Sequence, residues 1–363
     1  MSADDPHATE VDDQGRIVIR QHSTVVAVAH DAETFSNRVS THVHVPNGLD
    51  GAEHAAARRV LDPFLAPEAI DPLAPELTRI ARTLIDELVA AGGEFDGVQD
   101  LGARYAVRAQ SAWLGWRADL DDTLLAWVAE NRAASRTHDR ERMRRVAADF
   151  DQIVASLVAE RRAEPRDDVT TRLMMTLTEA EQPFTDAELV SILRNWTGGD
   201  LSSLALCAGI VVHWLALHSE HAAHLATASD AALDAAIDEI LRADDPFVSN
   251  RRVATRDTEI GGCPVAAGDV LVLDWRAANR DPAAFTNPDA FLPDEHAARN
   301  LVYGTGPHVC PGRGLATLEL RVLVRELLAA GALALDPRRP STREEPPVAG
   351  FRTVPVRLVS ERR

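Results

Sequence analysis

One loop near the end of the chain constrains the fold more than any other segment. Residues 303–312 read Tyr-Gly-Thr-Gly-Pro-His-Val-Cys-Pro-Gly, and a run with helical character, residues 315–320, follows them. Glycine has no Cβ, so Gly304 and Gly312 allow the backbone to pass close to a large flat ligand. A helix N-terminus carries partial positive charge, which favours the thiolate form of Cys310. The pattern predicts one thiolate bound to one large cofactor, for which haem iron is the obvious candidate.

Composition excludes several classes of function. The formal net charge of -18 argues against a nucleic-acid partner, which needs a basic surface. All 38 basic residues are arginine, so chemistry that requires a lysine is excluded. The widely separated Cys207, Cys263 and Cys310 form neither a disulfide framework nor a Cys-x-x-Cys site. The first residues are polar, and the longest apolar stretch, residues 204–217, is too short to span a bilayer. We therefore expect a cytoplasmic protein with no membrane anchor.

Helical periodicity dominates the chain after residue 50. Thr185 is a suitable N-cap for the longest helix, because Glu188 follows at the spacing of a capping box. A last helix is expected to end near residue 328. The other candidate helices cover residues 52–65, 75–91, 98–115, 120–134, 140–162, 168–177, 186–217 and 231–242.

Short strands are expected in three places. The first forty residues predict strands over residues 16–20 and 25–28. Residues 252–273 predict strands joined by turns at Gly261-Gly262 and Ala267-Gly268, and residues 348–359 alternate like a strand pair. Residues 279–300 show no regular pattern. We expect one domain over residues 1–363, mainly α with a small β region.

The cysteine loop resembles the haem-binding sequence of the cytochrome P-450 family. The shared spacing is Gly-x-Gly-x-His-x-Cys-x-Gly over residues 304–312, followed by Leu315-Ala316 and then Glu319. The alternative is a buried free cysteine in a tight loop. The resemblance extends over residues 52–359, whereas residues 1–50 are short and atypical. It implies a cytochrome P-450 fold, in which a long central helix crosses haem b and Cys310 is the axial ligand of the iron.

Glu239 and Arg242 stand three residues apart near the end of a predicted helix, where they share a face and can form an ion pair. Alone, this pair would be an ordinary surface ion pair of little energetic value. Its place before the cysteine loop resembles the Glu-x-x-Arg motif of the family, which has a structural role. The third partner of that motif is an arginine, and Ala290 stands at one expected position. His296 or Arg299 is a candidate substitute.

The two propionates of haem require cationic partners. His54 and Arg58 lie one helical turn apart, Arg252 follows in a predicted strand, and His308 precedes the cysteine by two residues. Taken singly, each would be a solvated charge. Taken as an ordered set, they resemble the positions that contact the propionates in bacterial members of the family.

Two glycines interrupt the longest predicted helix, at a cost of about 1 kcal/mol each relative to alanine. Close packing against another helix would explain them. The family resemblance instead implies an oxygen site at Gly198 and Gly199, followed by an acid and a threonine. Here Leu201 stands at the acid position and Ser202 at the threonine position. Asp200 lies one residue early, about 100° around the helix, and does not simply inherit the role.

The resemblance also implies a substrate pocket. Its expected walls include Asn195, Trp196 and Gly199, the stretches 43–49 and 245–249, and residues 350–353 with Phe351. Trp196 is equally well explained as a core residue. Gly199, Asp200 and Ser202 are the residues expected to serve oxygen activation, because a hydroxyl with a bound water and a carboxylate can relay protons.

The implied activity is a monooxygenase that inserts one oxygen atom from dioxygen into a small organic substrate, with a role in secondary metabolism. Electrons would come from NAD(P)H through a ferredoxin reductase and a ferredoxin, and the chain would act as a monomer. Leu201 leaves open a peroxide-driven enzyme or a non-hydroxylating oxidation such as oxidative coupling. A haem sensor without catalysis is a more remote alternative.

Overall fold

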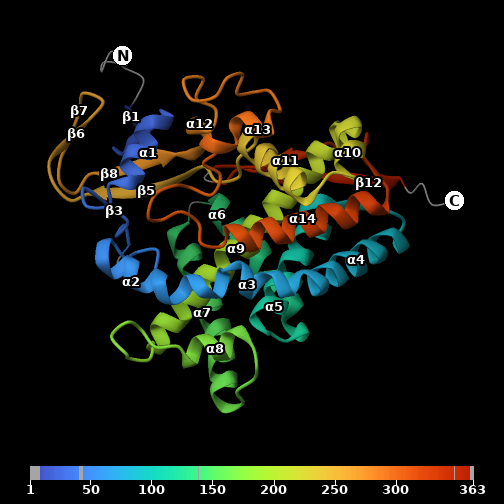
Figure 1. Ribbon diagram of the computed structural model, residues 1–363, viewed down its shortest axis with the longest axis horizontal. Coiled ribbons are helices and arrows are strands. Elements are labelled where there is room, and N and C mark those ends of the chain that lie inside the picture. The colour runs from blue at the N-terminus through green and yellow to red at the C-terminus, as the bar shows by residue number, and fades with distance from the viewer. Residues whose placement is uncertain (1–8, 41–43, 138, 347, 360–363) are drawn as a thin grey trace.

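The computed structural model describes residues 9–40, 44–137, 139–346 and 348–359. Helices fill most of the molecule, and a small sheet region lies at one end, at the upper left of Figure 1. The helices are α1 His22–His30, α2 Gly51–Leu61, α3 Pro67–Ile70, α4 Ala74–Ala90, α5 Arg104–Leu114, α6 Asp121–Thr137, α7 Arg140–Ala163, α8 Val169–Met175, α9 Asp186–Leu217, α10 Ser219–Leu225, α11 Asp230–Ala243, α12 Trp275–Ala278, α13 Pro293–His296 and α14 Arg313–Ala330.

Short helical turns connect several of these helices. Residues 97–103 form one π-helical turn that leads directly into α5, so the predicted helix over residues 98–115 is a π turn followed by an α-helix. It ends at Gly115, whose φ of 77° is the left-handed conformation that glycine adopts readily. The turns are η1 Asp62–Leu65, η2 Asp71–Leu73, η3 Gly97–Ala103, η4 Ala118–Leu120 and η5 Ala297–Arg299.

The largest sheet joins the N-terminal segment of the chain to residues 249–274. Its order is β1-β2-β8-β5-β3, and β2 pairs in parallel with β8 although about 250 residues separate them. The predicted strand over residues 25–28 is wrong, because this apolar run belongs to α1, which buries Val25 and Val28. The strands are β1 Thr9–Val11, β2 Ile17–Ile19, β3 Phe35–Ser36, β4 Glu94–Asp96, β5 Ser249–Ala254, β6 Thr258–Ile260, β7 Cys263–Val265, β8 Val270–Asp274, β9 Ala332–Leu335, β10 Thr342–Arg343, β11 Phe351–Thr353 and β12 Pro355–Val359.

The tail contains two strands, but they do not pair with each other. β11 pairs with β10, while β12 lies between β4 and β9 in a three-stranded sheet. The predicted turn at Gly261-Gly262 is confirmed between β6 and β7, where both glycines have positive φ.

The central helix α9 has the bounds predicted for it, Asp186–Leu217. Thr185 and Glu188 form the predicted capping box, with each side chain bonded to the backbone N–H of the other residue. α9 packs against η3, α5 and α7, which explains its apolar composition. It is long and apolar enough to cross a membrane by length and composition alone, but 61% of its most apolar window is buried inside the protein.

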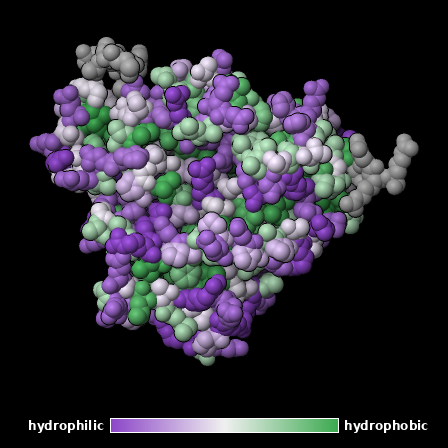
Figure 2. Space-filling view, in the orientation of Figure 1, coloured by the Kyte–Doolittle hydropathy of each residue, from purple (hydrophilic) through white to green (hydrophobic). Residues whose placement is uncertain are grey.

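Two contacts position the cysteine loop: α14, which follows it, packs against α4, and Gly306 within it packs against Ala29 of α1. α14 lies beside α4, and both run diagonally across the front of Figure 1. Over this face, hydrophilic and hydrophobic residues are intermixed, as Figure 2 shows. The loop before α14 therefore sits between the helical part and the sheet region.

Candidate functional site

The loop that ends in Cys310 is held by its own backbone. The N–H of Cys310 donates to the carbonyl of Tyr303 at 2.9 Å, and the N–H of Val309 donates to that of Gly306 at 3.0 Å. Gly306 has a φ of 75°, and a Cβ there would lie 2.6 Å from the carbonyl oxygen of Ala29 in α1. Glycine is therefore required where the loop packs on the N-terminal helix. This geometry presents Cys310 three residues before α14 begins.

Cys310 has solvent-exposed surface, although protein groups are packed closely enough around its sulfur to desolvate it. Burial raises the pKa of this thiol, while hydrogen bonds from the backbone of Gly312 and Arg313 lower it. The helix N-terminus thus acts in the predicted sense, but burial outweighs it, so the structure alone does not favour the thiolate. A bound metal ion would favour the thiolate of Cys310, because a thiol that coordinates a metal is deprotonated.

Four cationic or ionisable side chains gather beside the loop. The rings of His54 and His308 lie 4.0 Å apart between centroids. Each Nε2 atom is buried and has no hydrogen-bond partner among the described residues. Burial lowers the pKa of His308 to about 4, and His54 and Arg252 lower it further. Burial also lowers the pKa of His54 and brings that of Arg252 to about 10.

These side chains fit a group that carries carboxylates. Two imidazole nitrogens lack hydrogen-bond acceptors among the described residues, and the buried Arg252 guanidinium has one, the carbonyl of Arg251. An anion would supply acceptors and relieve the mutual repulsion of these groups. Arg58 differs from the rest, because its Nη1 atom donates to the carbonyls of Pro307 and Val309 at 3.2 Å. Its Nε atom meets Asp62. Arg58 therefore holds the cysteine loop as well as adding positive charge.

The helix α9 is continuous through its glycine pair. A Cβ on Gly199 would find no heavy atom within 4 Å, whereas one on Gly198 would touch Phe150 at 3.4 Å. Open space thus lies on the Gly199 side of the helix. Leu201, at the expected acid position, is fully buried. The hydroxyl of Ser202 accepts a long contact of 3.5 Å from Asn131.

Asp200 turns toward a neighbouring helix. Its carboxylate accepts a hydrogen bond from Gln110 of α5, whose amide also lies 3.5 Å from Glu319 of α14. Burial raises the pKa of Asp200 to about 7 and that of Glu319 well above its usual range. One oxygen of Glu319 and the amide oxygen of Gln110 are buried without partners among the described residues. Two carboxyls and an amide thus form a buried polar cluster.

The Glu239–Arg242 pair is confirmed as a buried ion pair. Arg242 donates to Glu239 at 2.7 and 2.9 Å, and neither residue exceeds 2% exposure. His296 is the third partner, because its Nδ1 lies 2.7 Å from the Glu239 carboxylate. Its Nε2 lies 2.9 Å from the carbonyl of Thr286. Both acceptors are oxygens, so both contacts are hydrogen bonds only when the ring carries two protons.

Neither other candidate for the third position meets Glu239. Ala290 has no polar side chain, and Arg299 donates to the carbonyl of Ala284 at 2.6 Å. His296 therefore takes the place beside Glu239 where the resemblance led us to expect an arginine.

The predicted pocket residues lie in different surroundings. Trp196 is 8% exposed and packs between the rings of Phe64 and Trp113, as a core residue does. Asn195 donates to the carbonyl of Val45 at 2.7 Å, which ties α9 to the segment before α2. Phe351 is 2% exposed. Residue 43 of the predicted stretch 43–49 lies outside the described residues.

Gln110 was not found from the sequence. It stands in the middle of a predicted helix, 90 residues before Asp200. A buried polar residue on an otherwise apolar helix face was the only signal, and such a signal does not identify its partner.

Comparisons with known proteins agree with this arrangement. The sequence profile described as "Cytochrome P450" matches residues 128–358. The chain is 31% identical to the erythromycin C-12 hydroxylase of Saccharopolyspora erythraea, over 93% of this chain and 87% of that protein. It is 26% identical to a steroid C26-monooxygenase of Mycobacterium tuberculosis, over 87% of each.

A solved structure matches the fold almost completely. It is a mutant of P450 EryK in complex with erythromycin B, with a TM-score of 0.89 and 28% identity. The match covers 98% of this chain and 94% of that one. The fold is that of an oxygen-activating haem enzyme. The chain belongs to the cytochrome P450 family, and it is a monooxygenase whose cofactor is haem b.

Proposed function

We propose that Cys310 is the axial ligand of the haem iron and that His54, Arg252 and His308 bind the propionates. The observation that carries this proposal is the pair of buried Nε2 atoms of His54 and His308, which make no hydrogen bond among the described residues and lie beside an accessible thiol. The Asp50 carboxylate lies 3.7 Å from Nε2 of His308, beyond hydrogen-bond distance. Haem, when bound through a thiolate, supplies oxygen activation. The side chains of this chain orient the cofactor, and the loop contacts of Arg58 keep the cysteine in place.

A cysteine substitution tests this assignment. Cys310→Ser should abolish the carbon monoxide spectrum characteristic of thiolate-ligated ferrous haem. Cys263→Ser is the matched control, because Cys263 is also free but lies in β7, outside the loop. His308→Gln should weaken haem retention without changing that spectrum. A thiolate spectrum that survives in Cys310→Ser would overturn the assignment.

Proton delivery on this enzyme is proposed to use Asp200 and Ser202, with open space for oxygen on the Gly199 side of α9. Asp200 has a pKa of about 7, so it can both give and take a proton near neutrality. Gln110 links Asp200 to Glu319, a second buried carboxyl whose raised pKa allows it to hold a proton. Ser202 offers a hydroxyl on the same stretch of α9 and can hold a water.

The turnover balance tests this route. In Asp200→Asn, consumption of NAD(P)H should continue while the amount of product per NAD(P)H falls. Without the proton supply from Asp200, more of the reduced oxygen should be released as hydrogen peroxide. Leu201→Ala is the control, since Leu201 has no proton to give. Equal coupling of reductant to product in Asp200→Asn and in the unmodified enzyme would contradict the route.

The proposed substrate is a bulky, largely apolar organic molecule, hydroxylated in secondary metabolism. The name of one relative specifies erythromycin and that of another a steroid, which are both large ring systems. A panel of macrolides and steroids can be screened for shifts in the ferric haem absorption band. A shift confined to flat molecules smaller than these would overturn the size class. We propose Asn195, Trp196 and Phe351 as pocket residues, with the core packing of Trp196 as the alternative.

Electrons are proposed to come from a ferredoxin and its reductase. Arg313 is the first residue of α14, next to the cysteine loop, and Arg59 follows Arg58, which contacts that loop. Their side chains are 56% and 61% exposed and pair with Asp238 and Glu179, and an acidic partner would compete for them. We further propose that the chain works in the cytoplasm as a monomeric single domain. Charge reversal at Arg59 should raise the concentration of ferredoxin needed for half-maximal rate, whereas reversal at the distant Arg338 should not.

A peroxide-driven enzyme or a non-hydroxylating oxidation is the second candidate. It is favoured by the apolar Leu201, which stands at the position where the resemblance leads us to expect an acid. Turnover with hydrogen peroxide at a rate that matches the complete reductase system would support it. A haem sensor would bind gas without substrate-dependent turnover.

A further inference from the structure

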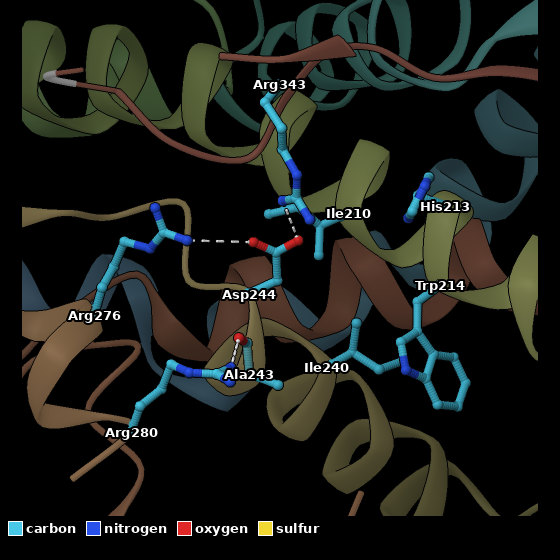
Figure 3. Close-up of a pocket in the computed structure, with 9 residues that line it drawn as sticks. All are labelled: Ile210, His213, Trp214, Ile240, Ala243, Asp244, Arg276, Arg280 and Arg343. Atoms are coloured by element: carbon cyan, nitrogen blue, oxygen red, sulfur yellow. Dashed lines mark hydrogen bonds and ion pairs between the residues drawn. The ribbon is translucent and has the colours of Figure 1, made fainter. Parts of the chain in front are cut away.

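A cavity of about 250 Å³ lies away from the cysteine loop, near the C-terminal ends of α9 and α11. Its walls come from α9, α11, α12 and β10, together with the residues that follow α11 and α12. Figure 3 shows Arg276 and Arg343 reaching Asp244 from two sides, with Trp214 and His213 at the other wall. No residue of the haem site lines it. It is therefore distinct from the cysteine loop, although Arg343 in its wall stacks on Phe351, a proposed substrate-pocket residue.

Positive charge exceeds negative charge in this cavity. Asp244 meets both Arg276, at 3.6 Å, and Arg343. Arg280 is already engaged, since it donates to the carbonyl of Ala243 at 2.7 Å and pairs with Asp289 outside the cavity. Two guanidiniums thus share one carboxylate, which leaves one net positive charge.

Both guanidiniums have donors to spare. Among the described residues, the guanidinium of Arg276 makes no hydrogen bond. Its ion pair with Asp244, at 3.6 Å, is too long to be a hydrogen bond. Arg343 makes one hydrogen bond, to Asp244, and stacks on Phe351 at 3.9 Å. Their side chains are 41% and 56% exposed, so a ligand can reach them. Guanidinium forks are suited to carboxylates.

The rest of the lining is apolar. Ile210, Ile240 and Trp214 contribute hydrocarbon and indole surface, which would pack against an apolar body rather than a hydrated inorganic ion. The neighbouring imidazole of His213 has a lowered pKa, because of burial and of Arg343, so it adds no charge. A volume of about 250 Å³ lies just below that of pockets for drug-sized ligands, which fits a small molecule.

We propose that this cavity binds a small organic monoanion, with its carboxylate on Arg276 and Arg343 and its apolar body against Trp214 and Ile240. Asp244 competes with the ligand for both arginines. This competition gives the proposal its sharpest consequence: loss of the Asp244 charge should strengthen binding, whereas loss of either arginine should weaken it.

The probe is 4-fluorobenzoate, observed by fluorine NMR on the haem-loaded enzyme at low salt. Saturating imidazole is present to occupy the haem iron, so that only binding elsewhere is measured. A ligand of this size should bind with a Kd on the order of 1 mM. Arg276→Gln and Arg343→Gln should each weaken binding roughly tenfold, because each removes a charge-assisted hydrogen bond. Asp244→Asn should tighten it.

Two controls separate this site from unspecific binding. 4-Fluorobenzyl alcohol has the same body without the charge and should bind far more weakly. Arg338→Gln removes an arginine outside the cavity that is more exposed, at 74%, and should leave the Kd unchanged. Each variant must keep its circular dichroism and haem absorption.

Several results would overturn the proposal. They are no binding at ten times the expected Kd, binding that imidazole abolishes, equal binding of the alcohol, binding unaffected by both arginine variants, and weaker binding in Asp244→Asn.

Discussion

The replacement Glu239→Gln should remove a large share of the stability of this enzyme. Glu239 accepts hydrogen bonds from Arg242 at 2.7 and 2.9 Å, from His296 at 2.7 Å and from the N–H of Leu292 at 3.0 Å. Glutamine has nearly the same size but no charge, and its NH2 group would face donors. Arg242, at 0% exposure, would remain buried without its counter-charge.

The magnitude follows from that burial. Removing one partner of a buried ion pair costs about 3–5 kcal/mol, whereas the whole free energy of unfolding of a typical protein is about 5–15 kcal/mol. The other contacts of Arg242, to the carbonyls of Asn279 and Pro288, persist and keep the loss within this range. His296→Gln should cost less, because the Glu239–Arg242 pair survives it.

Urea unfolding of the haem-loaded protein, followed by circular dichroism at pH 7, measures these losses. Glu130→Gln is the matched control, because Glu130 pairs with Arg142 at 2.7 and 2.8 Å but both side chains reach solvent, with 47% and 31% of their surface exposed. That surface pair should contribute about 0–1 kcal/mol. If Glu239→Gln lost no more free energy of unfolding than Glu130→Gln, the argument from burial would be refuted.

Three further predictions concern α9. Gly209→Ala should lose about 1–3 kcal/mol in urea unfolding, because its Cβ would lie 2.4 Å from a methyl group of Val98, while Gly199→Ala should not lose stability, because its Cβ meets open space. Equal losses would contradict this geometry. Thr185→Ala should cost about 1 kcal/mol by removing the N-cap, measured in the same assay; a neutral result would show that the cap is not stabilising. The pKa of Asp200 is raised from 3.8 to about 7, so the folded state binds the extra proton and the stabilising effect fades as pH rises through this interval. Unfolding free energies from pH 4 to 8 should therefore decline relative to those of Asp200→Asn, and parallel profiles would disprove the shift.

The central features of the fold were predictable because local signals agreed with tertiary structure. The ends of α9 follow from the Thr185 capping box, and the cysteine loop follows from its glycines and from the helix after it. The apolar run over residues 25–28 was misassigned, since a short apolar segment has no periodicity that separates strand from helix. Its helical state is fixed by the sheet and loop on which α1 packs.

The site was predictable only where residues carry a motif. The Glu239–Arg242 pair could be read directly, but the choice of His296 over Arg299 depended on the path of an irregular segment. The partner of Asp200 could not be read at all, because Gln110 lies on a helix that only the packing brings near. Contacts between distant helices have no local pattern.

The long-range contacts around the cysteine loop have a consequence for synthesis of the enzyme. Arg58 donates to the carbonyl of Pro307, 249 residues later in the chain, and β2 can pair only after β8 has been synthesised. A ribosome must therefore release nearly the whole polypeptide before either half of the cofactor site can close. Haem insertion is then a late event. During most of translation, Arg58 and β2 lack the later segments with which they pair. Slow stretches or pauses near the end of the message would prolong that exposed interval, in which chaperones have most to protect.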